Sequence, residues 1–412
     1  MSQLDFNKNL NKYADLAVEV GVNLQAGQRL LIWSSIEFAP LVEKVAVRAY
    51  QHGARLVETL WNDPQLLLAR FEYAPRDSFD EVSTWWAKAG LEYAERGDAV
   101  WSIRGTDPDL LRDMDSSLIS THRQAEARVA APYYQLVSAG AMNWSIVAHP
   151  VPAWAAKVFP DVPPGEQEAH LWKAIFDICR ITTADPVAAW TEQSAKLKAR
   201  CDDLNEKRYT ALHFTSPGTD LTVGLPAQHY WKGGGSTAEN GINHIPNLPT
   251  EEVFTAPDRA RVDGVVKASM PLNYNGALIS DFSVTFKDGR VTDVTAKQGE
   301  ALLRSLVETD EGAAYLGELA LVPHSSPIAQ SGRLFYNTLY DENAASHIAL
   351  GRAYRGCIDG SQGLSEEEFA ALGGNSSLIH VDFMIGTPAT DVDGVLPDGT
   401  SEPLMRQGEF VA

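Results

Sequence analysis

The order of apolar segments constrains the fold more than any other feature of this chain. In the first 200 residues, short apolar runs that suit strands alternate with stretches of helical periodicity. The strand-like runs lie at 29–33, 54–61, 99–103 and 145–148, and the helical stretches at 5–20, 38–52, 80–95 and 117–129. Strands and helices in this order, joined by short loops, are typical of βαβ units with parallel strands. The sequence therefore predicts an open, mostly parallel α/β layer in this part.

Beyond about residue 205 the pattern changes from alternation to hairpins. A polar helical stretch at 185–207 suits a connector, and the runs at 210–215 and 220–223 flank a Ser-Pro-Gly turn. Further strands are expected at 262–270, 277–286 and 290–296, with helices near 298–315 and 343–354. We predict two domains: an α/β domain over 1–205, and a largely antiparallel α+β catalytic domain over 206–412.

Composition excludes several classes of protein. With 44% hydrophobic and 21% charged residues, the 412-residue chain can bury large cores. A net charge of −20 disfavours binding to nucleic acid and to anionic membranes. No apolar run approaches the roughly 18 residues of a membrane span, and the N-terminus lacks a signal segment. Cys179, Cys201 and Cys357 form no CxxC pair, so we expect a soluble cytoplasmic protein.

The segment 376–386 carries the clearest chemical signal. Because alternate side chains of a strand share a face, His380 and Asp382 project together, flanked by Leu378 and Met384. The opposite face is entirely apolar: Ile379, Val381, Phe383 and Ile385. A half-buried imidazole beside a carboxylate suits a divalent metal, and an internal His–Asp hydrogen bond is the simpler alternative.

Other groups that can bind metal stand upstream. Glu251 and Glu252 precede an apolar pair, and Glu318 starts a strand-like run, although each glutamate alone also suits a solvated loop end. Asn343 is a typical N-cap before a predicted helix that carries His347 and runs to Gly351. Tyr354 would lie about 10.5 Å along that helix, far for a shared site unless Gly351 ends the helix.

Common catalytic motifs are absent or weak. The sequence has no Gly-x-Ser-x-Gly elbow, no Walker loop and no His-Glu-x-x-His. Residues 233–238 match G-x-G-x-x-A by letter, but Asn240-Gly241 would break the helix that a dinucleotide site requires. We interpret this stretch as a flexible loop which, beside Trp231, is a candidate for lining a substrate entrance.

Several long stretches carry a resemblance to a known family. They are Asn-Leu-Pro-Thr-Glu-Glu-Val-Phe-Thr-Ala-Pro (247–257), Leu-Asn-Tyr-Asn-Gly (272–276), Phe-Lys-Asp-Gly-Arg-Val (286–291), Ala-Lys-Gln-Gly-Glu (296–300), Asp-Glu-Gly-Ala (310–313), Gly-Glu-Leu-Ala-Leu-Val-Pro-His (317–324), Phe-Tyr-Asn-Thr-Leu-Tyr-Asp-Glu-Asn (335–343) and His-Val-Asp-Phe-Met-Ile-Gly (380–386). With these motifs the chain resembles peptidase family M29, the thermophilic-type metalloaminopeptidases that include aminopeptidase T, aminopeptidase S and PepS.

The resemblance implies a two-metal exopeptidase that removes N-terminal residues from peptides with a free N-terminus. The family's metal ligands fall on Glu252, Glu318, His347, His380 and Asp382, and Tyr354 is expected close to the metals. Glu342 is a further candidate, either as a ligand or as a base. The resemblance also implies a homodimer whose N-terminal domain helps to enclose a cavity.

Carboxylates with two imidazoles suit a pair of divalent ions, and we expect zinc, cobalt, manganese or magnesium rather than copper. Glu318 is the expected bridging ligand. Such ions would lower the pKa of a shared water, and one of them could hold the substrate's α-amine. Glu251 and Glu342 are candidates for general acid–base catalysis. Tyr354 would donate to the oxyanion, or else support His347.

Two alternatives follow from the same residues. A two-metal phosphoesterase would add Arg or Lys for phosphate, for which Lys297 and Arg333 are the only hints. A non-catalytic binding protein stabilised by metal would normally use a closed, cysteine-rich site. None of the candidate ligands is cysteine, which favours an open site.

Overall fold

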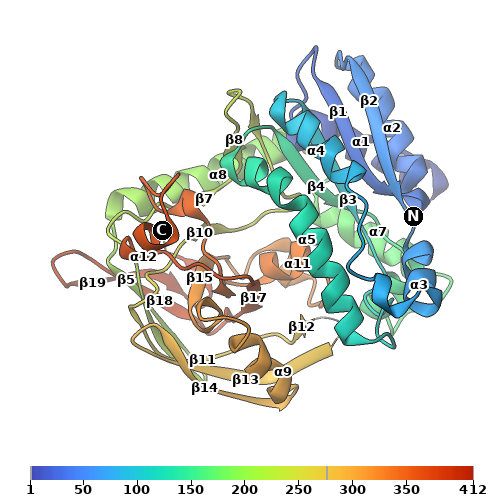
Figure 1. Cartoon of the computed structure of the whole chain (residues 1–412). Helices are drawn as coiled ribbons and strands as arrows, with labels where there is room; N and C mark the ends of the chain where they lie inside the picture. Colours follow the sequence, from blue (N-terminus) through green and yellow to red (C-terminus); the bar gives the residue numbers. More distant parts are fainter. Residues whose placement is uncertain (1, 275–276, 412) are drawn as a thin grey trace. The chain divides into compact units, whose positions relative to one another are not determined.

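The structure is a computed structural model that describes residues 2–274 and 277–411 (Figure 1). Asn275 and Gly276, the end of one motif, lie outside the described residues. The chain forms two compact units, Met1–Gln193 with Gly235–Pro249, and Ser194–Gly234 with Thr250–Ala412. The division falls within the predicted connector helix, and a later segment returns to the first unit. The division into two domains, 1–205 and 206–412, stays a prediction.

The first unit is built on a parallel sheet with the strand order β2-β1-β3-β4. Its strands are β1 (Arg29–Ser35), β2 (Leu56–Asn62), β3 (Ala99–Arg104) and β4 (Trp144–Ala148). The predicted parallel α/β layer is therefore confirmed, with strand ends within a few residues of the expected positions.

Helices cover both faces of this sheet. The helices and helical turns of this unit are α1 (Gln3–Leu16) with the π-helical turn η1 (Ala17–Gly21), η2 (Ile36–Phe38), α2 (Ala39–Gln51), α3 (Pro64–Tyr73), η3 (Arg76–Ser78), α4 (Trp85–Glu95), α5 (Ser116–Ala139), α6 (Pro152–Val158) and α7 (Gln167–Ile178). Leu31 and Val100 pack against Tyr93 of α4 and Tyr133 of α5, while α1 and α2 lie on the other side (Figure 1). Within the described residues, no helix is both long enough and apolar enough to cross a bilayer.

The flexible loop predicted at 233–238 is wrong, because part of it forms a strand within the segment 235–249. β8 (Ser236–Thr237) pairs with β9 (Asn243–His244), and the N–H of Ile146 in β4 donates to the carbonyl of Pro246 at 2.7 Å. Two-residue strands are too short to show alternation, so the sequence pattern did not reveal them. The helix α8 (Pro186–Lys207) contains the boundary between the units.

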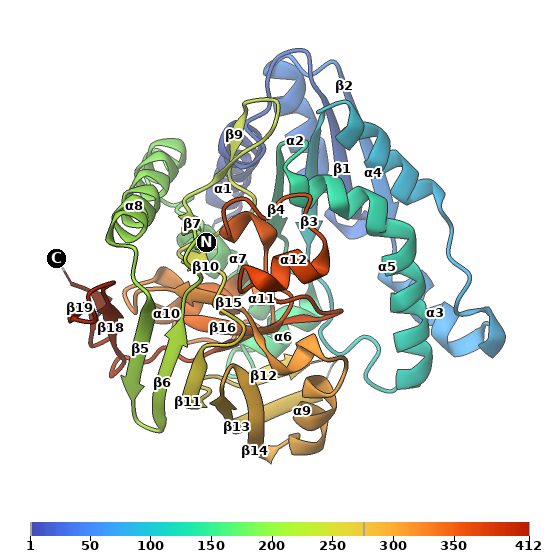
Figure 2. The same cartoon turned by 60° about the vertical axis from the view of Figure 1, so that its left-hand side comes forward.

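The second unit contains two antiparallel sheets (Figure 2). The five-stranded sheet has the order β17-β16-β15-β10-β7, with strands β7 (Lys232–Gly233), β10 (Val253–Thr255), β15 (Leu316–Leu321), β16 (His347–Gly351) and β17 (His380–Met384). The nine-stranded sheet comprises β5 (Ala211–Ser216), β6 (Thr219–Gly224), β11 (Val262–Lys267), β12 (Leu272–Tyr274), β13 (Ala277–Lys287), β14 (Arg290–Gln298), β18 (Asp391–Val395), β19 (Ser401–Arg406) and β20 (Glu409–Phe410). The predicted antiparallel fold is confirmed.

Short helices and turns complete the second unit. They are α9 (Glu300–Val307), η4 (Gly312–Ala314), α10 (Pro327–Gln330), α11 (Thr338–Asp341), η5 (Glu342–Ala344), η6 (Arg355–Cys357) and α12 (Glu366–Ala371). The helix predicted over 343–354 is wrong, because this region contains the strand β16. All five residues of β16 are buried, so the segment lacks the period-two pattern that distinguishes a half-exposed strand from a helix.

The core of the second unit lies between its two sheets. Leu319, Ile348 and Phe383 of the five-stranded sheet belong to one apolar cluster with Phe282 and Val284 of β13. The rings of Phe282 and Phe383 lie 5.3 Å apart. One face of the five-stranded sheet is thus committed to the core, and polar side chains can occupy only its other face.

Candidate metal centre

The register of three neighbouring strands gathers the candidate ligands on one face. Glu318 of β15 lies opposite Ala349 of β16, which lies opposite Asp382 of β17. His347 is two residues from Ala349, and His380 is two residues from Asp382, so all four polar side chains share this face. Ala349 is small and leaves the space between the two carboxylates open. The sequence suggested that Glu318 starts a strand. In the structure Glu318 lies inside the strand β15.

The five predicted ligands form two groups that share Glu318. The first group is Glu252, Glu318 and His347, and the second is Glu318, His380 and Asp382. Within each group, one ligand atom per residue can be chosen so that all lie within 4.8 Å of one another. One oxygen of Glu318, Oε1, is 3.6 Å from His347 Nε2, and the other, Oε2, is 3.4 Å from His380 Nε2.

The remaining carboxylates complete the two groups. Glu252 Oε2 lies 3.2 Å from His347 Nε2, and Asp382 Oδ1 lies 3.4 Å from His380 Nε2. Both oxygens are buried, and neither has a hydrogen bond of acceptable geometry. A buried carboxylate oxygen without a hydrogen bond is costly. This observation shows that the residues fit a bound cation, which would satisfy both oxygens.

The backbone orients both histidines. Nδ1 of His347 is 3.1 Å from the carbonyl of Ala345, and Nδ1 of His380 is 2.7 Å from the carbonyl of Arg352. A proton on each Nδ1 leaves the Nε2 lone pair facing the carboxylates, which is the usual arrangement of a metal-binding histidine.

Gly351 permits the close approach beside His380. It has a φ of +103°, and a Cβ at this position would lie 2.2 Å from the carbonyl oxygen of Ile379. A larger residue would therefore push β16 and β17 apart where Gly351 pairs with His380. Gly351 is a strand residue here and not the helix end that the sequence suggested.

Electrostatics reveal an excess of buried negative charge. Burial would raise the pKa of Glu318, but its interactions with His347 and His380 lower it to about 2. Burial would lower the pKa of both histidines, but the facing carboxylates raise it well above the usual value. Burial raises the pKa of Glu252 even though its partner His347 favours the ionised form. The two imidazoles therefore compensate only part of the acidity, which is the condition that a divalent cation relieves.

The candidate catalytic residues lie around these groups. Burial and the charges of Glu252 and Asp382 raise the pKa of Glu342 well above its usual value, so Glu342 is close to the centre without belonging to either group. Glu251 is buried and also belongs to neither group. The ring of Tyr354 is 4.8 Å from that of His380, and burial of its hydroxyl together with the charge of Glu318 raises its pKa well above the usual value.

Sequence reasoning missed the part played by Asn343. Instead of capping a helix, its side chain is buried, accepts a hydrogen bond from the Glu251 N–H at 2.7 Å and donates to the carbonyl of Leu339 at 3.1 Å. It thus joins the segment before β10 to α11. The sequence signal was the adjacent Glu342-Asn343 pair, whose partner cannot be identified without the fold.

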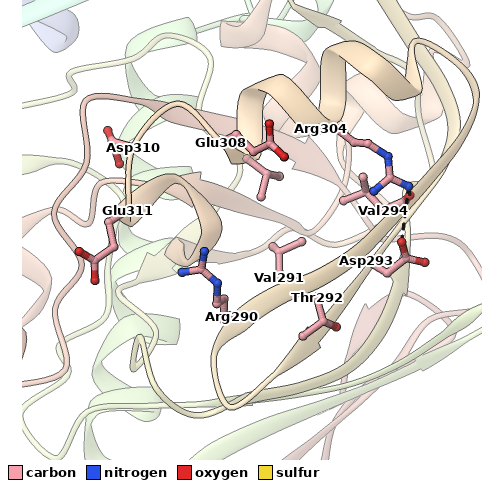
Figure 3. Close-up of a pocket in the computed structure, with 10 residues that line it drawn as sticks. Arg290, Val291, Thr292, Asp293, Val294, Arg304, Glu308, Asp310 and Glu311 are labelled. Carbon is pink, nitrogen blue, oxygen red and sulfur yellow. Dashed lines mark hydrogen bonds and ion pairs between the residues drawn. The ribbon is translucent and has the colours of Figure 1, made fainter.

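A cavity of about 530 Å³ lies elsewhere in the second unit, between β14 and α9 (Figure 3). Arg304 binds Asp293 at one side, and Glu308, Asp310 and Glu311 line the other. None of the candidate ligands is among the described residues that line this cavity. The convergence of ligand atoms is the stronger sign of a functional site, because the cavity wall is an ordinary mixture of surface charges.

Comparison with known proteins decides the family. The model of the family described as thermophilic metalloprotease (M29) matches residues 6–410. The chain belongs to the M29 family. This confirms the resemblance inferred from the motifs, and it extends over almost the whole chain.

Relatives of this M29 chain are similar along their full length. An aminopeptidase 2 from Geobacillus stearothermophilus is 47% identical over 405 residues, which cover 98% of each chain. The aminopeptidase AmpS of Bacillus subtilis is 44% identical over 98% of this chain and 99% of the relative. The solved structure of wild-type AmpT from Thermus thermophilus, at 42% identity, covers 99% of this chain and 100% of its own with a TM-score of 0.94.

Proposed function

We propose that this M29 chain is an aminopeptidase that releases N-terminal residues from peptides by means of two divalent ions. The observation that carries the proposal is the sharing of Glu318 between two groups of ligand atoms. Membership of a metalloprotease family and the names of the relatives support the same activity. The homodimer and the cytoplasmic location expected from the sequence stay predictions.

We assign the five candidate ligands to two ions. Glu252 and His347 would hold one, His380 and Asp382 the other, and Glu318, whose two oxygens face the two histidines, would be shared by both. Oxygen and imidazole ligands suit zinc, cobalt, manganese or magnesium. Bound there, the ions supply Lewis acidity for the peptide carbonyl and lower the pKa of a water molecule.

Glu342 is our candidate for proton transfer. Its carboxylate is close to both ligand groups and is a member of neither, which leaves it able to accept a proton from the attacking water and return it to the leaving nitrogen. Glu251 is the second candidate, since it is buried directly beside Glu252.

Tyr354 is our candidate for stabilising the oxyanion. Its ring packs on His380 and its hydroxyl is close to Glu318 and Asp382, so the O–H group can donate to an oxygen that becomes negative at the centre. The free α-amine of a substrate could bind one of the ions as a neutral ligand, and this would favour substrates with a free N-terminus.

Metal removal tests the proposal. Dialysis against a chelator should abolish hydrolysis of aminoacyl-p-nitroanilides, and addition of a divalent metal should restore it. N-acetylated versions of the same substrates should not be cleaved, because acetylation removes the free amine that would bind an ion. Full activity after verified metal removal, or equal cleavage of free and acetylated substrates, would contradict the proposal. A parallel assay with p-nitrophenyl phosphate separates it from the phosphoesterase alternative.

A further inference from the structure

We propose that Lys232 binds a carboxylate of the peptide substrate, so that the site favours peptides with a negative group near the cleaved bond. That group would be the terminal carboxylate of a short peptide or an acidic side chain. The inference rests on the proposed peptidase function and specifies its substrate class. It follows from a lysine without a partner on the face of the sheet that carries the metal centre.

Lys232 lies on the same face of the five-stranded sheet as the candidate ligands. In the pairing of β7 with β10, Lys232 is directly opposite Phe254, and directly opposite residues of a strand pair share a face. The next residue of β10 towards the ligands, Val253, points to the other face and belongs to the core between the sheets. The Phe254 ring is 6.2 Å from the ring of Tyr354, which in turn is 4.8 Å from that of His380. Ring contacts thus link the position of Lys232 to the metal centre.

The amine of Lys232 lies against the turn that follows Tyr354. A Cβ on Gly356 would be 2.5 Å from Nζ of Lys232 and 3.4 Å from its Cε, so this glycine leaves the room that the amine occupies. Burial raises the pKa of the neighbouring Cys357 thiol to about 12; the charge of Lys232 acts in the opposite direction, and that of Glu318 acts in the same direction as burial. The thiol is therefore within electrostatic range of both the lysine and the proposed bridging carboxylate.

The charge of Lys232 has no partner within the part of the chain that the structure describes. There, no carboxylate forms an ion pair with its Nζ, and no acceptor forms a hydrogen bond with it. By contrast, Arg355 of the same turn is paired with Glu366 at 2.8 Å. Lys232 is half-buried, and its neighbours Phe254 and Cys357 belong to an apolar cluster. An ammonium that is partly removed from water gains from a counter-ion, and here a ligand would have to supply it.

A carboxylate is the anion that a peptide substrate brings. The ions would take the α-amine and the carbonyl of the cleaved bond, which leaves any carboxylate of the substrate for a contact beside the centre. The lysine amine is a point charge on a flexible stem, so it can meet a carboxylate in more than one position. A charge-assisted contact of this kind changes binding by about 10- to 100-fold.

The test compares metal-loaded wild type and Lys232→Gln on three pairs of substrates that differ in one carboxylate. Leu-Leu and its amide vary the chain end, the amides of Leu-Glu and Leu-Gln vary the second residue, and glutamyl- and glutaminyl-p-nitroanilide vary the first. In at least one pair the wild type should prefer the charged member, and Lys232→Gln should lower this preference in kcat/KM by about tenfold or more. Lys232→Glu should reverse it. Leucine p-nitroanilide has no carboxylate, and Lys232→Gln should cleave it like the wild type.

Two further variants separate a direct contact from a general effect of charge. Burial raises the pKa of the Tyr354 hydroxyl and the exposed Arg352 acts in the opposite direction, so this second cation is also near the centre. Arg352→Gln should lower the preference far less than Lys232→Gln does, because solvent screens an exposed charge. Lys297→Gln removes a lysine of β14 whose side chain is 81% exposed, and it should leave the preference unchanged.

The outcomes separate this inference from the proposed function. If the wild type cleaves none of the substrates, the peptidase proposal itself fails. If the wild type is active but its three preferences are the same in Lys232→Gln, only the carboxylate contact is overturned. An equal loss of preference in Arg352→Gln would also overturn it, since the effect would then be long-range attraction. Loss of metal from Lys232→Gln, with an equal loss of activity on every substrate, would assign the lysine to the stability of the centre and overturn it as well.

Discussion

Tyr354 is partly exposed to solvent and partly buried beside the metal centre. The residue is 45% exposed, while its hydroxyl is buried close to Glu318 and Asp382. If the hydroxyl stabilises the oxyanion, Tyr354→Phe should lower kcat by about 10²- to 10³-fold, the usual cost of losing one such donor. Metal content, measured by atomic absorption, should stay at the wild-type level, because Tyr354 is not one of the five ligands that we propose.

His380→Ala is the matched comparison, since it removes a neighbouring side chain that we assign to the metal. This variant should lose metal as well as activity. Wild-type kcat in Tyr354→Phe would show that the hydroxyl takes no part in the reaction. Metal loss in Tyr354→Phe would instead assign Tyr354 to the ligand set.

At the residue scale, the sequence identified the candidate ligands better than it predicted where they lie in the fold. His380 and Asp382 could be placed on one face from strand alternation alone, since both lie in one short segment. Glu252, Glu318 and His347 could be selected only through the family motifs, because nothing local distinguishes a buried ligand from a solvated glutamate. The structure brings all five together. Their role as ligands remains a proposal, as do the roles of Glu251, Glu342 and Tyr354.

At the scale of elements, the centre depends on how strands are joined to the segments beside them. Asn343 connects the Glu251–Glu252 segment to α11 through two buried hydrogen bonds. Asn343→Ala removes both and should destabilise the protein by about 1–3 kcal/mol, the cost of leaving buried groups unpaired. It should also lower kcat by about tenfold or more, because small displacements of catalytic groups are expensive.

Asn143 in the first unit provides the control for Asn343. It is equally buried, and its side chain donates to the carbonyl of Val22 at 2.6 Å and accepts from Gln28 at 2.9 Å. Asn143→Ala should lose similar stability in thermal unfolding but keep its kcat at a temperature where both variants are folded. If both variants lose the same fraction of kcat, Asn343 acts through general stability and not through the centre.

Element types were predicted where a pattern was present. The parallel strands β1 to β4 and the β5–β6 hairpin follow from short apolar runs and turn residues. The strand β16 was mistaken for a helix because both of its faces are covered, which removes the alternation. The register that aligns Glu318, Ala349 and Asp382 depends on long-range pairing, and no local pattern encodes it.

At the scale of the whole molecule, the fold class follows from the change of pattern near residue 205, whereas the division into domains at that residue stays a prediction. The family match spans nearly the entire chain. The return of 235–249 to the first unit could not be predicted. Its contacts, such as the bond from Ile146 to Pro246, join residues about a hundred positions apart.

The first unit should lose stability in acid, because it buries neutral histidines. His149 stacks on Phe38 with centroids 4.2 Å apart and lies 4.6 Å from the ring of Trp172. Burial lowers its pKa to about 4, although its hydrogen bond to the Pro150 carbonyl acts in the opposite direction. Burial likewise lowers the pKa of His244 to about 4.

The direction of the pH effect follows from proton binding. Below the usual histidine pKa of about 6.5, the unfolded chain takes up a proton on each residue, and the folded unit does not until about pH 4. The free energy of unfolding should therefore be at its full value above about pH 6.5 and should fall on acidification to about pH 4, by at most about 3 kcal/mol per histidine.

Urea unfolding between pH 7 and 4 measures how steeply the free energy of unfolding changes with pH. His149→Phe keeps the aromatic packing without a titrating group, so its slope should be shallower than that of the wild type. Identical slopes for wild type and His149→Phe would show that the buried imidazole is not the origin of acid sensitivity.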